Sequence, residues 1–339
     1  MPKPELTFFT ELPDEELEEL FKSRFVIDDL KALNASLSLG ILDLSEKRAA
    51  VIKRLNDAEI PVIAWLLLPK EDGYWFNITN YEEAAARYVS FKAWTMAHDL
   101  KWAGVGLDIE FDIREVQQLM PEEGSEKWLS TMFQRFCNKK RFEQAQRRYQ
   151  ALVELIQADG FTVESYQLPL ISEERRAKST VLQRTTGIVD IETDREVFML
   201  YSSFLRPDGA AALWSYAPEA DSVGVGSTGG GVELEGVIDI EPLNWEELTR
   251  DLRLCVMQGK PVHIFSLEGC VKQGFLSKLS TFEWDQPAEI PNTVNKVKAI
   301  RTGLAAGLWV LERPWVILIS LAALIGLGFL FKRGKSKTS

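Results

Sequence analysis

The chain has 339 residues, 46% of them hydrophobic and 26% charged, which is the composition of a globular protein with an ample core. With 14 Pro, 22 Gly and 3 Cys, it is not a disordered chain, a collagen or a small disulfide-bonded scaffold. The net charge of −11 is uneven, because the last eight residues hold four bases and no acid. Without those four, 35 basic and 50 acidic residues leave the body at −15. Nucleic-acid binding is therefore excluded, since phosphate contacts need clustered Lys and Arg.

Eight short β-rich segments alternate with helical patterns along the chain. Several are continuous apolar runs, such as VIAWLLL at residues 62–68, as expected of strands buried on both faces. Helix starts are predicted at Ser45, at Asn80 with Glu83, and at Asn244 with Glu247. The expected strands are residues 6–10, 36–42, 62–68, 104–109, 162–168, 196–202, 222–226 and 262–266.

Eight strands alternating with helices predict an α/β fold, a closed parallel (β/α)8 TIM barrel, in preference to a doubly wound sheet. We expect the barrel to occupy residues 1–290, with a helical insertion at about 113–159. Within this insertion a basic cluster indicates either a solvated helix face or a contact with a membrane surface. The cluster consists of Lys139, Lys140, Arg141, Arg147 and Arg148.

The C-terminal region has the pattern of a single membrane anchor. From Trp315, 17 residues are interrupted only by one Ser and two Gly, and as a helix they span about 25 Å, the short end of what crosses a bilayer. Pro314 suits the first helical position, and the bases beyond the span can reach lipid headgroups. We expect a transmembrane helix at 314–331, a juxtamembrane connection at 291–313 and a basic tail at 332–339. A buried C-terminal helix is the alternative.

The side of the membrane follows from weaker signals. Residues 1–20 are acidic and broken by three prolines, unlike a signal sequence, and the three scattered cysteines have no disulfide or zinc spacing. Both features favour a cytoplasmic body with a C-terminal anchor. The basic tail alone argues for the opposite orientation, but it is nearly balanced by Lys296, Lys298, Arg301 and Arg313 on the other flank. We expect a cytoplasmic body.

Chemistry in such barrels collects at the carboxyl ends of the strands, and these positions are acidic and aromatic. In GLDIEFD, Asp108 and Glu110 share one face of the strand and the apolar Leu107 and Ile109 share the other. We expect the acids to face the barrel mouth, where burial and mutual repulsion raise their proton affinity and supply a general acid. A structural pair bridged to a barrel Arg or Lys is the alternative. The candidate substrate-binding residues are Glu11, Asp43, Trp75, Tyr166, Gln167, Trp214 and Glu268.

Two short motifs carry a family resemblance. AGVGLDIE, residues 103–110, resembles the strand-4 signature D-G-x-D-x-D-x-E of the family 18 glycoside hydrolases, the chitinase-like barrels. The chain keeps the glycine and the last two acids of that signature, and has Ala103 and Gly106 at its first two aspartates. MLYS, residues 199–202, is similar to the M-x-Y-D element of strand 6, with Ser202 in place of the acid.

The resemblance implies a catalytic trio of Glu110, Asp108 and Tyr201. Glu110 would protonate the glycosidic oxygen, and Asp108 would orient the N-acetyl group of the substrate, whose carbonyl acts as the nucleophile. Tyr201 would hold that group. The two missing aspartates leave open a sugar-binding descendant without activity.

Other chemistries have less support. The run GVGSTGGG, residues 224–231, lies where barrels often cradle phosphate, but no helix follows directly, which favours a flexible loop beside the mouth. Neither His98 nor His263 belongs to a metal-binding motif, and we expect them to be structural. We expect no cofactor and no metal. An all-carboxylate Mg²⁺ or Mn²⁺ site remains an alternative, formed by Glu11, Asp43, Glu110 and Glu268.

The leading hypothesis is a membrane-anchored, glycoside hydrolase-like barrel that acts on or binds carbohydrate, or another small-molecule ligand. One alternative is an inactive, membrane-tethered binding or scaffold barrel. Another is a carboxylate–metal enzyme acting on a phosphorylated substrate. The first hypothesis requires the Asp108 and Glu110 side chains to face the mouth and not the helix layer.

Overall fold

Eight parallel strands form one closed barrel in chain order, with the eighth paired to the first, so the predicted (β/α)8 barrel is confirmed. The computed structural model describes residues 2–118, 125–231 and 240–316. The strands are β1 (Leu6–Thr10), β2 (Ser36–Ile41), β3 (Val62–Leu66), β4 (Gly104–Ile109), β5 (Val163–Gln167), β6 (Arg195–Met199), β7 (Ser222–Gly226) and β8 (Val262–Phe265).

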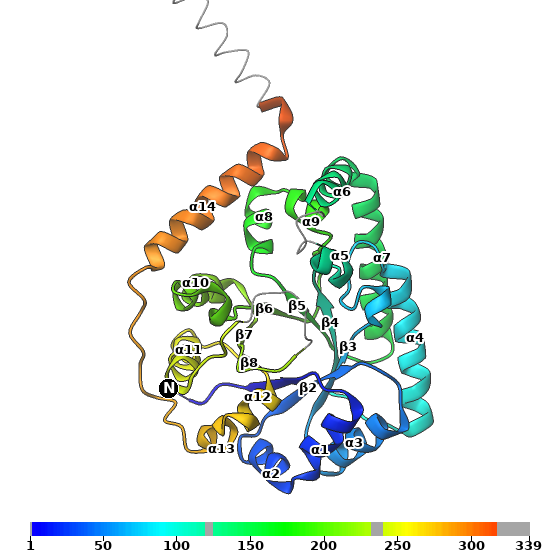
Figure 1. Ribbon diagram of the computed structural model, residues 1–339, viewed down its shortest axis with the longest axis vertical. Helices are drawn as coiled ribbons and strands as arrows, with labels where there is room; N and C mark the ends of the chain where they lie inside the picture. Colours follow the sequence, from blue (N-terminus) through cyan, green and yellow to red (C-terminus); the bar gives the residue numbers. More distant parts are fainter. Residues whose placement is uncertain (1, 119–124, 232–239, 317–339) are drawn as a thin grey trace, which may run out of the picture.

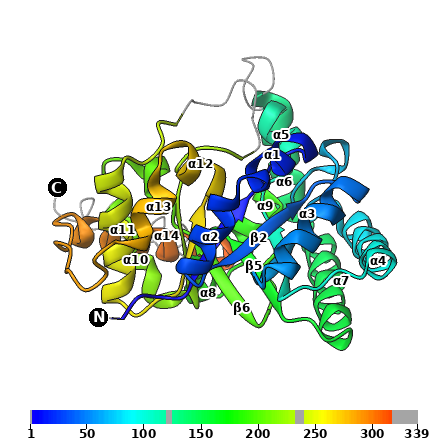
Figure 2. The same cartoon turned by 90° about the horizontal axis from the view of Figure 1, so that it is seen from below.

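Helices surround the strands in a ring (Figures 1 and 2). The first half of the chain contributes α1 (Asp14–Lys22), α2 (Arg24–Ala32), α3 (Glu46–Asp57), the short η1 (Lys70–Asp72), α4 (Tyr81–His98), α5 (Ile113–Gln118), α6 (Ser125–Cys137) and α7 (Lys139–Ala158). The second half contributes α8 (Ile171–Ala177), α9 (Val181–Thr186), η2 (Ser202–Leu205), α10 (Gly209–Tyr216), η3 (Ala217–Glu219), α11 (Trp245–Met257), α12 (Leu267–Lys272), α13 (Phe275–Ser280) and α14 (Val294–Leu311).

The strands agree with the sequence prediction, and the differences lie at their ends. The segment expected at 62–68 is paired only as far as Leu66, because Leu68 donates its backbone N–H to Tyr74 and begins the next loop. The segment expected at 196–202 is β6, which ends at Met199. The remaining residues of these segments lie beyond the pairing, at the mouth.

The barrel interior is packed with aromatic side chains. The Phe9 ring lies edge-on to those of Trp65 and Tyr166, with centroids 5.3 and 4.8 Å away. Tyr166 also occupies the space beside Gly106, where a Cβ would lie 2.3 Å from the Tyr166 hydroxyl oxygen. The position where the family 18 signature has an aspartate is therefore filled by a tyrosine ring from the neighbouring strand.

Two of the three predicted helix caps are confirmed. Ser45 accepts the Arg48 backbone N–H at 3.0 Å, and Asn244 forms a capping box with Glu247. The capping box predicted at Asn80 is wrong, because the Asn80 side chain makes no cap bond. Its oxygen instead accepts the Tyr149 hydroxyl at 2.9 Å, a partner that is distant in sequence.

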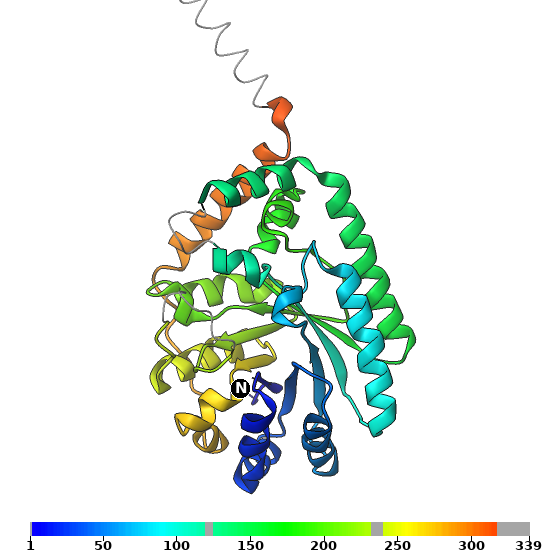
Figure 3. The same ribbon diagram turned by 45° about the vertical axis from the view of Figure 1, so that its right-hand side comes forward.

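The region expected as a juxtamembrane connection contains α14, which lies against the outside of the helix ring (Figures 1 and 3). Arg301 projects from α14 into the helix layer, where it is only 3% exposed and forms an ion pair of 2.6 Å with Glu173. Arg301 therefore belongs to the barrel's packing and is not a free flanking charge.

The predicted membrane span and basic tail fall almost entirely on residues 317–339, which lie outside the described residues. Within the described part of the chain, no helix combines the length and the apolar character needed to span a bilayer.

Candidate active site

The alternation of side chains along β4 places Asp108 inside the barrel. Its carboxylate Oδ2 accepts the indole N–H of Trp65 at 3.1 Å, and Trp65 belongs to the aromatic cluster of the interior. Leu107 and Ile109, which alternate with Asp108, are fully buried in the core outside the barrel. The apolar side chains therefore leave Asp108 on the interior face of β4, and Glu110, directly after the strand, continues the same alternation.

Asp108 and Glu110 both hold their protons more tightly than free carboxylic acids. Burial raises the pKa of Asp108 well above its ordinary value, and the negative charges of Glu110 and Glu11 raise it further. Burial raises the pKa of Glu110 to about 7. Glu110 is partly exposed, so it can exchange a proton with a bound molecule or with water. Near neutral pH the pair can both donate and accept a proton.

Asp108 is also incompletely paired. Within the described residues, its second carboxylate oxygen, Oδ1, is buried without a hydrogen-bond partner. Buried polar groups in proteins are usually hydrogen-bonded, and exceptions concentrate at functional sites.

Tyr201, the third residue of the predicted catalytic trio, lies beside this pair. Burial raises the pKa of its phenol, followed by the negative charges of Asp108, Glu110 and Glu11. Its ring lies 5.5 Å from that of Phe265 at the end of β8. The structure therefore places Tyr201 in the electrostatic field of the carboxylates, with the hydroxyl protonated and able to donate a hydrogen bond.

A cavity of about 1010 Å³ opens at the ends of β1, β3, β7 and β8. Glu11 and Glu268, both predicted from the sequence, line it together with Lys70 and Lys272. Burial raises the pKa of Glu268, and this outweighs the polar groups next to it. The lining includes neither Asp108 nor Glu110, so the cavity lies to one side of the carboxylate pair of β4.

Tyr74 lies between the cavity and the carboxylate pair. It lines the cavity, its hydroxyl donates to Glu11, and the negative charge of Asp108 contributes to raising its pKa after burial and Glu11. Trp75, a predicted substrate-binding residue, is 9% exposed and stacks edge-on against Tyr74 with centroids 5.3 Å apart. Sequence reasoning singled out Trp75 but not Tyr74. Gly73, a turn glycine directly before Tyr74, is the signal that could have indicated a tight loop presenting both rings.

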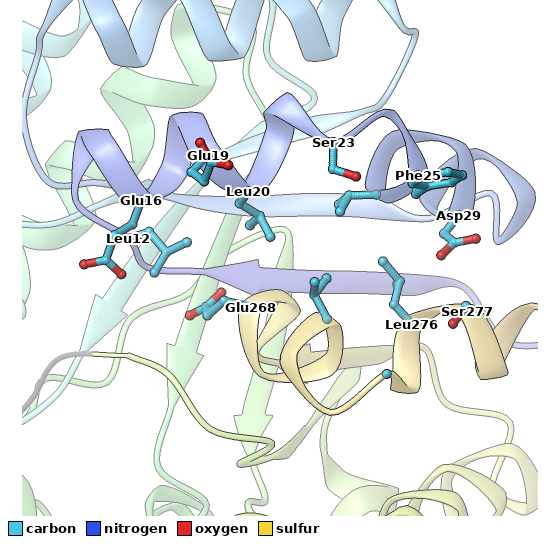
Figure 4. Close-up of a pocket in the computed structure, with 13 residues that line it drawn as sticks. Leu12, Glu16, Glu19, Leu20, Ser23, Phe25, Asp29, Glu268, Leu276 and Ser277 are labelled. Carbon is cyan, nitrogen blue, oxygen red and sulfur yellow. The ribbon is translucent and has the colours of Figure 1, made fainter.

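A second hollow of about 440 Å³ continues from the cavity between the α1–α2 and α12–α13 helices. The two hollows share Leu12, Glu16 and Glu268. Figure 4 shows Glu16 and Glu268 at one end of this groove and Phe25 at the other, with Leu20 between them. The groove adds an apolar extension to the acidic mouth.

The glycine-rich run lies against the mouth carboxylates. A Cβ at Gly230 would lie 2.6 Å from the Glu268 carboxylate, and one at Gly231 would lie 3.1 Å from Glu11 Oε2. Both glycines also have positive φ angles, +88° and +89°, so any side chain would be strained there. The loop thus packs on two acids, which would repel a phosphate, and the phosphate-cradle interpretation gains no support.

Asp43 does not join the mouth. Its carboxylate pairs with the buried guanidinium of Arg48 at 3.1 Å, and Arg48 also donates to the Gly40 carbonyl at 2.9 Å. Burial raises the pKa of Asp43, but Arg48 outweighs burial and leaves that pKa below its ordinary value. The predicted substrate-binding role is replaced by a structural ion pair.

Three other predicted substrate-binding residues also lie away from the cavity. Tyr166 is fully buried in the barrel interior, where its hydroxyl bonds Ser38 at 2.7 Å. Gln167 alternates with Tyr166 and points into the helix layer, where it is completely buried. Trp214 lies within α10 and packs against the outer core. All three belong to the packing of the barrel.

Metal chemistry gains no support. No group of three or more metal-binding side chains lies close enough together within the described ranges to hold an ion. His263 has two structural partners, Ser222 at 2.8 Å and Glu164 at 3.2 Å, as expected of a satisfied interior histidine.

The fold and the mouth together define a (β/α)8 barrel with protonatable carboxylates at its carboxyl end. No protein-family profile matches the chain, and no curated protein matches it.

Matches among solved structures share the barrel fold. A D-allulose 3-epimerase from Methylomonas sp. is 9% identical, with 88% of this chain and 99% of that chain covered and a TM-score of 0.43. A xylose isomerase domain protein from Planctomyces limnophilus is 12% identical, with 91% and 99% covered and a TM-score of 0.44. A family 18 chitinase from Pseudoalteromonas aurantia is 10% identical, with 82% and 99% covered and a TM-score of 0.39. At these values the similarity concerns the fold alone.

Proposed function

We propose that the protein is a membrane-anchored barrel that acts on carbohydrate, with Glu110 as general acid and Asp108 as its partner. The observation that carries this proposal is the position of the two carboxylates at alternate residues, one in the last part of β4 and one directly after the strand, with no basic partner on Asp108 among the described residues. The pKa of Glu110, raised to about 7 by burial, suits an acid that must be protonated at neutral pH.

The chemistry that fits these residues is substrate-assisted hydrolysis. Glu110 gives its proton to the glycosidic oxygen as the bond to the anomeric carbon breaks, and the carbonyl oxygen of the substrate's N-acetyl group attacks that carbon. The Asp108 carboxyl orients the amide of the same group through a hydrogen bond, and Tyr201 donates a hydrogen bond to that group. Water then opens the cyclic intermediate after losing a proton to the Glu110 carboxylate. No enzyme nucleophile is required.

The surroundings of the pair suit a neutral sugar. Tyr74 lines the cavity and offers an aromatic ring for contact with the apolar side of a pyranose, and Trp75 packs edge-on against Tyr74 without lining the cavity. Glu11 and Glu268 supply acceptors for hydroxyl groups in the adjoining cavity and disfavour anionic substrates.

The second candidate is a sugar-binding barrel without activity, and two observations favour it. Tyr166 fills the space of a signature aspartate at Gly106, and Tyr74 stands between the cavity and the carboxylate pair. In this case the cavity binds the ligand and the pair of β4 takes no part in a reaction.

Hydrolysis of N-acetylglucosamine oligomers separates the two candidates. The full chain is assayed in a polyoxyethylene detergent, because sugar-headed detergents would compete for the site. We expect cleavage by the unaltered protein and a loss of at least about a hundredfold in Glu110→Gln. The matched control is Glu164→Gln, which changes a buried carboxylate at the other end of the barrel and should retain cleavage.

Binding of the oligomers by all three proteins with cleavage by none would contradict the enzyme and establish the binding protein. Equal cleavage by Glu110→Gln and the unaltered protein would contradict the role of Glu110.

For the cellular location, we propose a single C-terminal membrane helix at residues 314–331 and a cytoplasmic body. The apolar run from Trp315 onward, the flanking bases and the free, exposed thiol of Cys137 support this arrangement, because an exposed cysteine persists unpaired in reducing compartments.

A further inference from the structure

Basic side chains from three separate elements meet where the described chain ends. Lys139, the first residue of α7, lies 3.8 Å from the carboxylate of Glu312, just after α14. The next residue, Arg313, donates to the Ala177 carbonyl at 3.2 Å, and Lys178 follows Ala177 at the end of α8. The acid at the centre is neutralised, because Glu312 also pairs with Arg184 at 2.7 Å.

We call this surface the basic face and define it as Lys139, Lys140, Arg141, Lys178 and Arg313. Large apolar side chains are exposed on α14 and on α6, the helix that directly precedes α7. Phe133 on α6 is 70% exposed, and Trp309 on α14 is 41% exposed with the Arg313 guanidinium 4.8 Å above its ring. Aromatic rings and bases side by side are typical of surfaces that lie at the headgroup level of a bilayer.

The basic face is held rigidly against the barrel. α14 is fastened by the buried Arg301–Glu173 ion pair and by Leu308, which packs against Ala177 and Val181. Only one residue separates Arg313 from Trp315, where the proposed membrane helix begins, so the two lie at most about 7 Å apart. A helix that enters the bilayer at Trp315 therefore brings the basic face to the membrane surface.

We propose that the basic face binds the anionic surface of the bilayer that anchors the protein. The inference rests on the proposed anchor, and it adds a contact that the anchor alone does not require. It also orients the body: the C-terminal end of α14, which Arg313 follows, lies at the rim of the helix ring in Figure 1, so the barrel axis runs along the membrane.

A dye on Cys137 tests this directly. Cys137 is exposed at the end of α6, next to the basic face, whereas Cys255 and Cys270 are buried, so a thiol reagent labels one position. The labelled full chain is reconstituted into vesicles with a quencher on the lipid headgroups of both leaflets. We expect stronger quenching with phosphatidylserine present than in phosphatidylcholine alone. A Cys137→Ser, Lys53→Cys protein, labelled on α3 across the ring, should show no such dependence.

A matched pair of charge reversals locates the effect. Lys140→Glu with Arg141→Glu should lower the serine-lipid dependence by at least about fivefold, since each base near an anionic surface strengthens association by about that factor. Arg147→Glu with Arg148→Glu makes the same charge change on the same helix. It lies two turns, about 10 Å, farther along, which is a full Debye length at about 0.1 M salt. This second protein should behave as the unaltered one does.

Four outcomes are decisive. Equal loss in both charge-reversed proteins, or quenching that does not depend on phosphatidylserine in protein that floats with vesicles, overturns the basic face and leaves the anchor standing. Failure of the full chain to float with vesicles of either composition overturns the anchor, and the inference with it. Lipid-dependent quenching lost only in the Lys140, Arg141 protein supports the basic face.

Discussion

The pKa values of buried carboxylates are shifted in opposite directions at the two ends of the barrel interior. At the amino end, Glu164 has His263 at 3.2 Å and Arg195 at 3.5 Å. Burial alone raises the pKa of Glu164, but these partners outweigh it and the pKa is lowered. At the mouth, the Trp65 indole is the hydrogen-bond partner of Asp108 among the described residues, and the pKa of Asp108 is raised well above the ordinary value.

The contrast distinguishes a carboxylate that stabilises the fold from carboxylates that are available for function within one barrel. A paired acid stabilises the fold, because ionisation in the native state is favoured over ionisation in the unfolded chain. An unpaired acid at the mouth costs stability once it ionises, and proteins retain such groups where a ligand or reaction uses them. We therefore assign Glu164 to the architecture and the Asp108–Glu110 pair to function.

The helix layer contains another buried carboxylate that has a basic partner. Glu173 is fully buried and has Arg301 at 2.6 Å and the Tyr216 hydroxyl at 2.9 Å. The Arg301 guanidinium also lies 3.7 Å over the Tyr216 ring. This network fastens α14 to α8 and α10.

The largest expected effect on stability comes from removing the basic partner of Glu173. Arg301→Met leaves the Glu173 carboxylate buried without its partner and should lower the free energy of unfolding by about 3–5 kcal/mol. The melting temperature of the full chain, followed by near-ultraviolet circular dichroism, should fall by about 10 °C. Adding Glu173→Gln should restore part of the loss, because the remaining side chain is neutral. An unchanged melting temperature in Arg301→Met would contradict the claim that this ion pair stabilises the fold.

A smaller effect, of opposite sign, is expected at the mouth. The pKa of Glu110 is raised from 4.5 to about 7, so its ionisation destabilises the native state progressively as the pH rises between these values. Glu110→Gln removes this cost and should stabilise the protein by about 1–3 kcal/mol above pH 7, with no difference below pH 4.5.

Glu164→Gln is the matched control, because its effect on stability should have the opposite sign. Because its pKa is lowered, Glu164 stabilises the native state at any pH above the ordinary pKa of a glutamate. That stability is lost as the pH falls through the lowered pKa. At neutral pH, Glu164→Gln should therefore melt below the unaltered protein. Melting curves across this pH range that move in the same direction for both proteins would contradict the division between the two ends.

Much of the fold follows from the sequence because its signals are local. Short β-rich segments, several of them continuous apolar runs, marked all eight strands, and Ser45 and Asn244 marked helix starts through partners three residues away. Asn80 also marked a helix start, that of α4, but its predicted capping box is absent because a distant hydroxyl, that of Tyr149, competes for its side chain. The packing of α14 also depends on long-range contacts that no local pattern contains.

The residues of the candidate site also divide into those that a local pattern predicts and those that depend on long-range contacts. Alternation along β4 was enough to turn Asp108 and Glu110 toward the mouth. Asp43 follows β2 and Gln167 ends β5, but the contacts of both side chains lie away from the cavity. Tyr74 was missed because its role depends on the fold of the loop after β3, where it reaches Glu11.

The most direct test of the central claim is the ionisation of Glu110 itself. Infrared difference spectra between the unaltered protein and Glu110→Gln isolate the carboxyl absorption of this residue as the pH is raised. We predict a protonated carboxyl signal that disappears with a midpoint of about 7. A midpoint near the ordinary value of 4.5 would mean that Glu110 is ionised at neutral pH, and the mouth would then lack the acid on which the account depends.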